Sequence, residues 1–190
     1  MRKAVIFNYN SLFAKDIVKT IKNYNLLNPE RALQAEILEA GKYPIESMAG
    51  QSDVILHSGG DGKPVEEDIS VPKLYICHSH QWKAKIEGGT ISRLKSYRKG
   101  IHLINVLEDD DIMGKKGEIP IMQYHILAVT HSPARSKVLA LSRAIDEHGK
   151  EIQVIEALRY PDGSLSIQGH AEEGTASHIF YNFFNYTQAL

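Results

Sequence analysis

The chain has 190 residues, of which 43% are hydrophobic and 24% charged, the proportions of a soluble globular protein with a sizeable core. With a net charge of −1, nothing in the overall charge points to nucleic acid or an anionic membrane, and we expect neither as partner. The length fits one domain, and a single domain over 1–190 is expected.

The first apolar run, residues 4–7, is too short for a signal peptide. No stretch approaches the roughly 20 apolar residues that span a bilayer. The chain has one cysteine, Cys77, which excludes an internal disulfide. We therefore expect a cytoplasmic protein whose thiol is free to react.

The first ninety residues alternate between short apolar runs and amphipathic stretches. Residues 12–24 have apolar side chains at helical spacing, with Ser11 as a plausible N-cap. Strands are expected at 3–8, 35–40, 52–64 and 72–81, followed by a helix from about Gln81. This order predicts a parallel sheet with helices on its faces, in which sites form beyond the carboxyl ends of the strands.

From about residue 89 the pattern changes to short β-rich segments separated by turns. The segments "DEHGKE" and "YPDGSL" are typical of hairpin turns, because Asp and Gly favour tight bends. The strands of this half are expected at 89–95, 99–107, 119–129, 136–145, 151–160 and 163–170. The end of the chain, 174–188, predicts a closing helix with Ile179, Phe183 and Tyr186 on one face.

Cys77 ends an apolar run in "KLYICHSHQW", immediately before the expected helix. Such a strand–turn–helix junction exposes a nucleophile, and a helix N-terminus favours the thiolate that attacks carbonyl groups. A small, inert, buried cysteine is the alternative for a lone thiol in an apolar run.

Two further segments could complete a site with Cys77. In "SIQGHAEEG" an apolar strand ends at His170, and Glu172 could orient its ring as a base for the thiol. In "HSGGDG" the glycines Gly59 and Gly60 would let a substrate approach backbone N–H groups that stabilise an oxyanion. The alternatives are a solvated acidic turn and an ordinary Gly-rich loop.

Together, in this order, the three segments resemble the class I glutamine amidotransferase family. That family has a strand ending in Gly-Gly, a Gly-x-Cys-x-Gly-His-Gln elbow, and a late strand ending Gln-Phe-His-Pro-Glu. The corresponding stretches are "ILHSGG" (55–60), "YICHSHQ" (75–81) and "IQGHAEE" (167–173), with weaker similarities at 88–95 and 123–129.

The resemblance implies an α/β fold, a three-layer αβα sandwich with a mostly parallel, flavodoxin-like central sheet, here with a β-rich C-terminal half. It implies a catalytic triad of Cys77, His170 and Glu172 and no cofactor. Gly59 and Gly60 would lie beside the oxyanion hole, together with the backbone N–H of His78. Gln81 corresponds to the family's Gln, which helps to hold the glutamine substrate.

Four positions depart from the family pattern. Tyr75 and Ser79 replace the elbow glycines, so that the Tyr75 ring must point away from the turn. Gly169 and Ala171 replace the Phe and Pro around the histidine, which we expect to loosen that loop. None of these changes removes a reacting group, but they leave open whether glutamine is the substrate.

His78 and His80 have the spacing of metal ligands, and Asp61, His57 or His125 could complete such a site. No metal is expected, because His80 coincides with the family's elbow histidine. The acidic run at 109–111 is interpreted as a solvated loop.

The leading hypothesis is a cysteine-dependent hydrolase that releases ammonia from glutamine for a separate synthetase subunit. A γ-glutamyl amide or peptide hydrolase acting without a partner is the alternative enzyme. A binding or regulatory domain of the same fold without turnover is the third possibility, for which Tyr75 and Ser79 are the best support.

Overall fold

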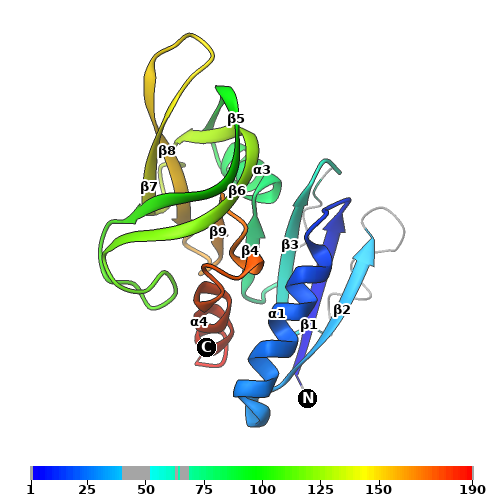
Figure 1. Cartoon of the computed structure of the whole chain (residues 1–190). Helices are drawn as coiled ribbons and strands as arrows, with labels where there is room; N and C mark the ends of the chain where they lie inside the picture. The colour runs from blue at the N-terminus through cyan, green and yellow to red at the C-terminus, as the bar shows by residue number, and fades with distance from the viewer. Residues whose placement is uncertain (1, 40–51, 63, 65–68, 190) are drawn as a thin grey trace.

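The computed structural model describes residues 2–39, 52–62, 64 and 69–189. Five strands form the parallel half of one large sheet, which lies at the lower right in Figure 1. In spatial order they are β2 (Leu33–Glu39), β1 (Arg2–Tyr9), β3 (Val54–Gly60), β4 (Lys73–Ile76) and β9 (Leu165–Ile167). The centres of β1, β3 and β4 are buried, as expected for parallel strands covered by helices, whereas the edge strand β2 is partly exposed.

The sheet continues beyond β9 as an antiparallel half. Its strands, in spatial order, are β8 (Glu151–Arg159), β7 (Lys137–Ile145), β5 (Thr90–Val106) and β6 (Gly117–His131). The segments expected separately at 89–95 and 99–107 form the single strand β5, whose register against β6 shifts between Arg93 and Arg98. The long β5–β6 hairpin curves over the rest of the molecule (Figure 1).

The α/β class predicted from the sequence is confirmed, and all nine described strands belong to one mixed sheet. The expected mostly parallel, flavodoxin-like layering is not confirmed. Among the described residues, four strand pairings are parallel and four are antiparallel. The antiparallel pairings all come from the β-rich segments after residue 89, where short turns replace crossover helices.

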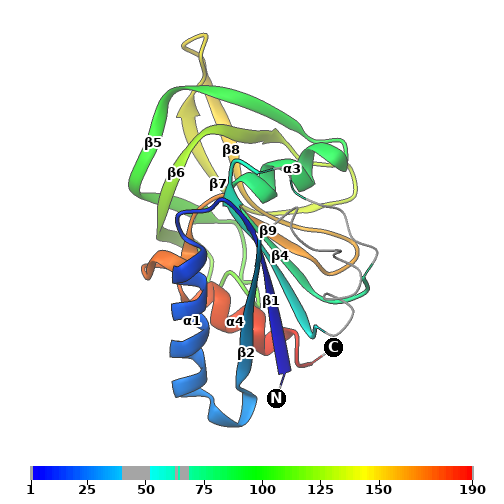
Figure 2. The ribbon, with the colours of Figure 1, turned by 90° about the vertical axis from the view of Figure 1, so that its right-hand side faces the viewer.

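The helices cover the two faces of the sheet. α1 (Ala14–Leu27) and α4 (His178–Tyr186) pack into the largest core cluster, which includes Ile6 of β1. α3 (His78–Ile86) packs on the opposite face, where Ala84 contacts a separate cluster with residues of β6 and β8 (Figure 2). Two short 3₁₀ helices, η1 (Pro29–Arg31) and η2 (Ala171–Glu173), follow α1 and precede α4.

The expected helices and turns form, with different bounds. α1 begins at Ala14, and Ser11 accepts a hydrogen bond from the Phe13 N–H in the bend before it. α3 begins at His78, directly after β4 and earlier than expected. The strand expected at 35–40 is β2, and residue 40 lies outside the described residues. No helix among the described residues is long and apolar enough to cross a membrane.

Candidate active site

A pocket of about 240 Å³ lies at the carboxyl ends of the parallel strands. The residues after β1, β3, β4 and β9 meet there, as the topology of a parallel sheet requires. Two aromatic residues of the β5–β6 hairpin close the remaining side. The lining residues are Asn10, Leu12, Phe13, Gly60, Asp61, Cys77, Tyr97, Tyr124 and His170.

Cys77 occupies a strained turn between β4 and α3. Its backbone has φ 53° and ψ −106°, a left-handed conformation that costs a non-glycine residue on the order of 1–3 kcal/mol. Hydrogen bonds fix the turn on both sides: the Cys77 N–H donates to Ile167 O (2.8 Å), and Cys77 O accepts from the Gln81 N–H (3.1 Å). These two hydrogen bonds maintain the strained turn and so hold the thiol at the end of the strand, on the pocket wall.

His170 follows β9 and reaches Cys77 from the neighbouring strand end. The His170 ring lies beside Cys77 on the pocket wall, where the cysteine side chain raises the pKa of the ring, and His170 Nδ1 lies 2.8 Å from Glu172 Oε1. The Phe13 ring packs on the imidazole with a centroid distance of 4.2 Å. The backbone N–H of His170 donates to Met122 O (2.7 Å). The structure thus places His170 beside Cys77 at the pocket and pairs the histidine with Glu172.

The charge of this histidine is set by two opposing effects. Burial lowers the pKa of His170, but the Glu172 carboxylate and the Cys77 side chain raise it by more. The net result is a pKa of about 10. The ring is therefore protonated at neutral pH. Glu172 Oε2 is buried without a hydrogen-bond partner among the described residues, so this carboxylate is directed mainly at the histidine.

Gly59 and Gly60 adjoin these side chains at the end of β3. A Cβ on Gly59 would lie 3.2 Å from His170 Cε1 and 3.3 Å from Cys77 Cβ, so there is no free space for a side chain. Gly60 has φ +111°, and a Cβ there would lie 2.0 Å from Tyr9 O. Gly60 therefore requires glycine, whereas a side chain at Gly59 would force its neighbours to move by a few tenths of an ångström.

The other two predicted residues take different places. His78 begins α3, where the first backbone N–H groups of a helix have no partner within it. Its ring contacts the backbone of Gly62 and is half-buried, and burial lowers its pKa. Gln81 lies outside the residues that line the pocket. Its amide donates to Leu127 O (2.6 Å) and to Gln168 Oε1 (3.1 Å).

The departures from the family pattern are accommodated locally. Tyr75 is buried and stacks on His57, with a centroid distance of 4.4 Å, away from the pocket. Ser79 is buried and donates to Ser58 O (2.5 Å), which ties α3 to β3.

The loop around His170 is not loosened, contrary to expectation. A Cβ on Gly169 would lie 2.7 Å from the Ile121 side chain, so β6 packs tightly against it. The glycine makes room for the strand that carries Tyr124 to the pocket.

The residues considered as metal ligands do not gather. His80 is fully buried and bonded to Ser166 Oγ (2.7 Å) and Ile155 O (3.1 Å), and burial lowers its pKa to about 3. Within the described ranges no three His, Cys, Asp or Glu side chains are placed to bind one ion.

The acidic run at 109–111 is only partly solvated. Asp110 accepts hydrogen bonds from Arg159 Nη2 with both carboxylate oxygens (2.9 and 3.0 Å) and caps the N–H groups of Ile112 and Met113. Its role is to anchor the loop before β6.

Sequence reasoning missed the aromatic wall of the pocket. Tyr124 lies between Tyr97 and Phe13, with ring centroids 5.1 and 5.9 Å away. Phe13 follows β1, so the rule that sites form at carboxyl strand ends could have indicated it. Tyr97 and Tyr124 come from the antiparallel hairpin, and nothing in their local sequence predicts that it curves back to the site.

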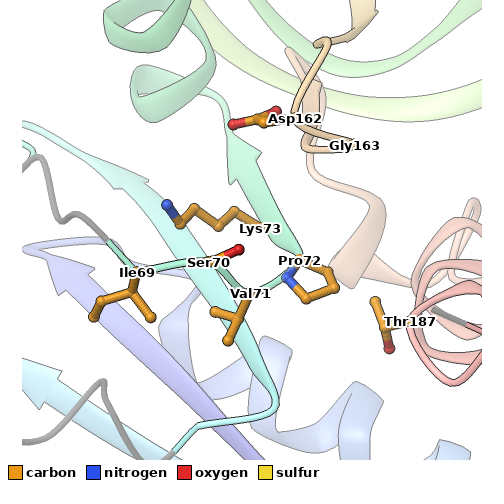
Figure 3. A pocket seen from close by; sticks show the side chains of 8 residues that line it. All are labelled: Ile69, Ser70, Val71, Pro72, Lys73, Asp162, Gly163 and Thr187. Atoms are coloured by element: carbon orange, nitrogen blue, oxygen red, sulfur yellow. The ribbon is translucent and has the colours of Figure 1, made fainter.

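A second pocket, of about 370 Å³, lies at the opposite, amino end of β4 (Figure 3). Lys73 begins β4 there, whereas Cys77 follows its other end. Asp162, on the far wall in Figure 3, accepts the Ser164 N–H (2.9 Å) as a turn cap. This pocket therefore lies away from the thiol and the histidine.

Curated proteins related to this chain are glutamine-hydrolysing subunits of GMP synthase. The one from Sulfolobus acidocaldarius is 28% identical over 90% of this chain and 89% of its own length. The one from Sulfurisphaera tokodaii is 29% identical over 100% of this chain and 98% of its own length. No family model matches the chain.

The fold is also found among solved structures. A Thermoplasma acidophilum protein, provisionally named as the corresponding GMP synthase subunit, superposes with a TM-score of 0.80 over 100% of this chain and 95% of its own, at 17% identity. The resemblance to glutamine amidotransferases that the sequence indicates is confirmed by these relatives.

Proposed function

We propose that this chain, a relative of the glutamine-hydrolysing subunits of GMP synthase, is a one-domain enzyme that hydrolyses the carboxamide of glutamine with Cys77 as nucleophile. The observation that carries the proposal is the contact of Cys77 with His170, itself paired with Glu172, at a strained turn on the wall of a pocket. A reactive thiol needs such a partner, and an inert buried cysteine does not.

In the first step the Cys77 thiolate attacks the carboxamide carbon, and a C–S bond forms. The backbone N–H groups near Gly60 and His78 stabilise the negative oxygen. The C–N bond then breaks, and protonated His170 gives its proton to the departing ammonia. Its raised pKa suits this step, since the ring holds a proton at neutral pH.

In the second step water replaces ammonia. The neutral His170 ring takes a proton from the water as its oxygen attacks the thioester carbon, and the C–S bond breaks. Glutamate leaves, and the sulfur and the histidine return to their starting charges. Glu172 holds the ring orientation and stabilises the imidazolium in both steps.

Glutaminase assays on three variants test this function. Cys77→Ala should abolish ammonia release, and His170→Asn should lower it by at least about 10²-fold. Glu172→Gln keeps the shape of the side chain but removes the charge, so an intermediate loss is expected. Full glutaminase activity in Cys77→Ser would rule the proposal out, and no activity in the intact chain would favour a silent binding or regulatory domain.

The proposed fate of the ammonia is transfer to a separate synthetase subunit. The support is that the relatives are themselves named as one subunit of a synthase. Mixing the chain with a candidate synthetase subunit should increase ammonia release from glutamine and couple it to product formation. Ammonia release that is unchanged by the partner, with no complex on gel filtration, would indicate an enzyme that acts alone.

A γ-glutamyl amide hydrolase is the second candidate, and the pocket wall favours it. The wall has three aromatic side chains, whereas no Lys or Arg among the described residues lines the pocket to bind an α-carboxylate. A larger amide with an apolar substituent would fit such a wall. A panel of glutamine and N-substituted γ-glutamyl amides separates the two functions by their relative kcat/KM values.

A further inference from the structure

The surroundings of the Cys77 sulfur hold a second polar side chain besides the histidine. Gln168 is fully buried, and its Nε2 lies 3.8 Å from Cys77 Sγ. Burial of a carboxamide costs free energy of folding unless its polar atoms form hydrogen bonds. The question is therefore which of its two ends faces the sulfur, and what sets that orientation.

The orientation follows from a fixed carbonyl on β6. Leu127 O can only accept, so the group of Gln81 that lies 2.6 Å away must be its NH₂. The same NH₂ lies 3.1 Å from the side chain of Gln168, which must present its oxygen there. The NH₂ of Gln168 is then left on the sulfur side.

The sulfur thus has one acceptor and two donors around it. The neutral thiol can donate to Tyr124 O at 3.7 Å. After it loses its proton it can only accept, and its donors are the His170 ring and the Gln168 amide. A donor that binds the charged sulfur more strongly than the neutral one favours the charged form.

We propose that Gln168 stabilises the Cys77 thiolate through an N–H···S hydrogen bond, and that Gln81 is a positioning residue that locks the Gln168 amide with its NH₂ toward the sulfur. The inference rests on the proposed role of Cys77 as nucleophile. It gives Gln81 a role in orienting Gln168 and not in binding substrate. The Gln81 amide is bonded to Leu127 O and to the Gln168 side chain, and Gln81 does not line the pocket.

The pH profile of thiol alkylation tests the proposal without any turnover. Cys77 is the only cysteine, so the rate of iodoacetamide addition to the native chain reports this one sulfur. Gln168→Met keeps the length of the side chain but removes the donor, and should move the midpoint of the profile up by roughly one pH unit. Gln81→Met should move it in the same direction by less, because Gln168 keeps its amide but loses its lock.

The matched control is Gln153→Met, an exposed glutamine on β8 outside the candidate site, which should leave the midpoint unchanged. An unchanged midpoint in folded Gln168→Met would overturn the proposal. So would a larger shift in Gln81→Met than in Gln168→Met, because Gln81 is proposed to act only through Gln168.

A measurement on the unaltered chain keeps the proposal testable if the variants do not fold. The side-chain NH₂ resonances of Gln168 in ¹⁵N NMR should shift with pH at the same midpoint as alkylation, and carbamidomethylation of Cys77 should abolish that shift. Resonances that do not respond to the thiol would overturn the inference. A chain with this response but no glutaminase activity would refute the proposed function alone.

Discussion

Gly59 lies beside the two side chains that are proposed to react, Cys77 and His170. Gly59 adopts no positive φ, so alanine can take its backbone conformation, but the added methyl would meet both Cys77 and His170 at 3.2–3.3 Å. Each neighbour must then move by a few tenths of an ångström. Because the proposed catalysis would depend on that geometry more steeply than folding does, Gly59→Ala should lower kcat/KM for glutamine by roughly 10- to 100-fold. Its melting temperature should change little.

Gly89 gives the opposite pattern and serves as the control. A Cβ there would lie 2.8 Å from Ala84 O and 2.9 Å from His131 O, which are backbone atoms that cannot turn away. Gly89 is not among the residues that line the pocket. Gly89→Ala should therefore lower the melting temperature and leave kcat/KM of the folded protein nearly unchanged. If the loss in kcat/KM relative to the loss in melting temperature were the same in Gly59→Ala and Gly89→Ala, that result would contradict a special role for Gly59.

At the scale of the element, α3 is attached to the sheet by a neutral histidine. His80 Nε2 donates to Ile155 O and its Nδ1 accepts from Ser166, so the ring links α3 to β8 and β9. Protonation would convert the acceptor into a second donor. Burial accordingly lowers the pKa of His80 to about 3. The ring is neutral in the folded state down to that pH, whereas in the unfolded chain it binds a proton below about 6.5.

This difference predicts a loss of stability in acid. Between pH 6.5 and 3 the unfolded chain binds more protons than the folded one, so the free energy of unfolding falls as pH falls, by a few kcal/mol over the whole window. His80→Leu should be less stable at pH 7 and should lose less stability between pH 7 and 4, in urea titrations. His148→Gln, at an exposed turn, should keep the wild-type slope. Equal slopes in wild type and His80→Leu would refute this account.

Helix α3 also shows which structural features can be predicted from local sequence and which cannot. The apolar run before Cys77 and the turn residues after it predict a strand followed by a helix, and both form. The helix begins three residues early because the strained turn at Cys77 is held by Ile167 of β9, a contact from ninety residues away. Similarly, the pairing of Cys77 with His170 was expected from the resemblance, whereas the place of Gln81 depends on Leu127 of a distant strand. Local pattern predicts elements, and long-range packing decides side-chain partners.

At the scale of the whole molecule, the antiparallel half curls back over the site. β6 is the last strand of the sheet, yet Met122 forms a β-bridge with His170 beyond β9. Figure 1 shows how the β5–β6 hairpin curves over the molecule, and Tyr124 of β6 lines the pocket. No local sequence signal encodes this curl, because it depends on side chains from four strands meeting inside the curl.

Those side chains surround one buried carboxylate. Glu156 of β8 accepts from Arg98 of β5 (2.9 Å), from Ser142 of β7 and from Gln123 of β6 (2.9 Å). Its side chain is fully buried, and that of Arg98 is 10% exposed. A buried ion pair contributes little compared with an apolar pair, but removal of one partner leaves a charge that cannot be hydrated.

Arg98→Met should therefore lower the free energy of unfolding by about 3–5 kcal/mol in urea titrations at pH 7. Arg143→Met is its matched control, because Arg143 forms an ion pair with Glu151 at the same distance, 2.9 Å, but both side chains are more than half exposed. An exposed pair is worth only about 0–1 kcal/mol. The double variant Arg98→Met/Glu156→Gln removes the stranded charge and should recover part of the loss. Equal effects of Arg98→Met and Arg143→Met would show that the curl does not depend on this network, and that packing of β6 on β8 alone holds the aromatic wall over Cys77.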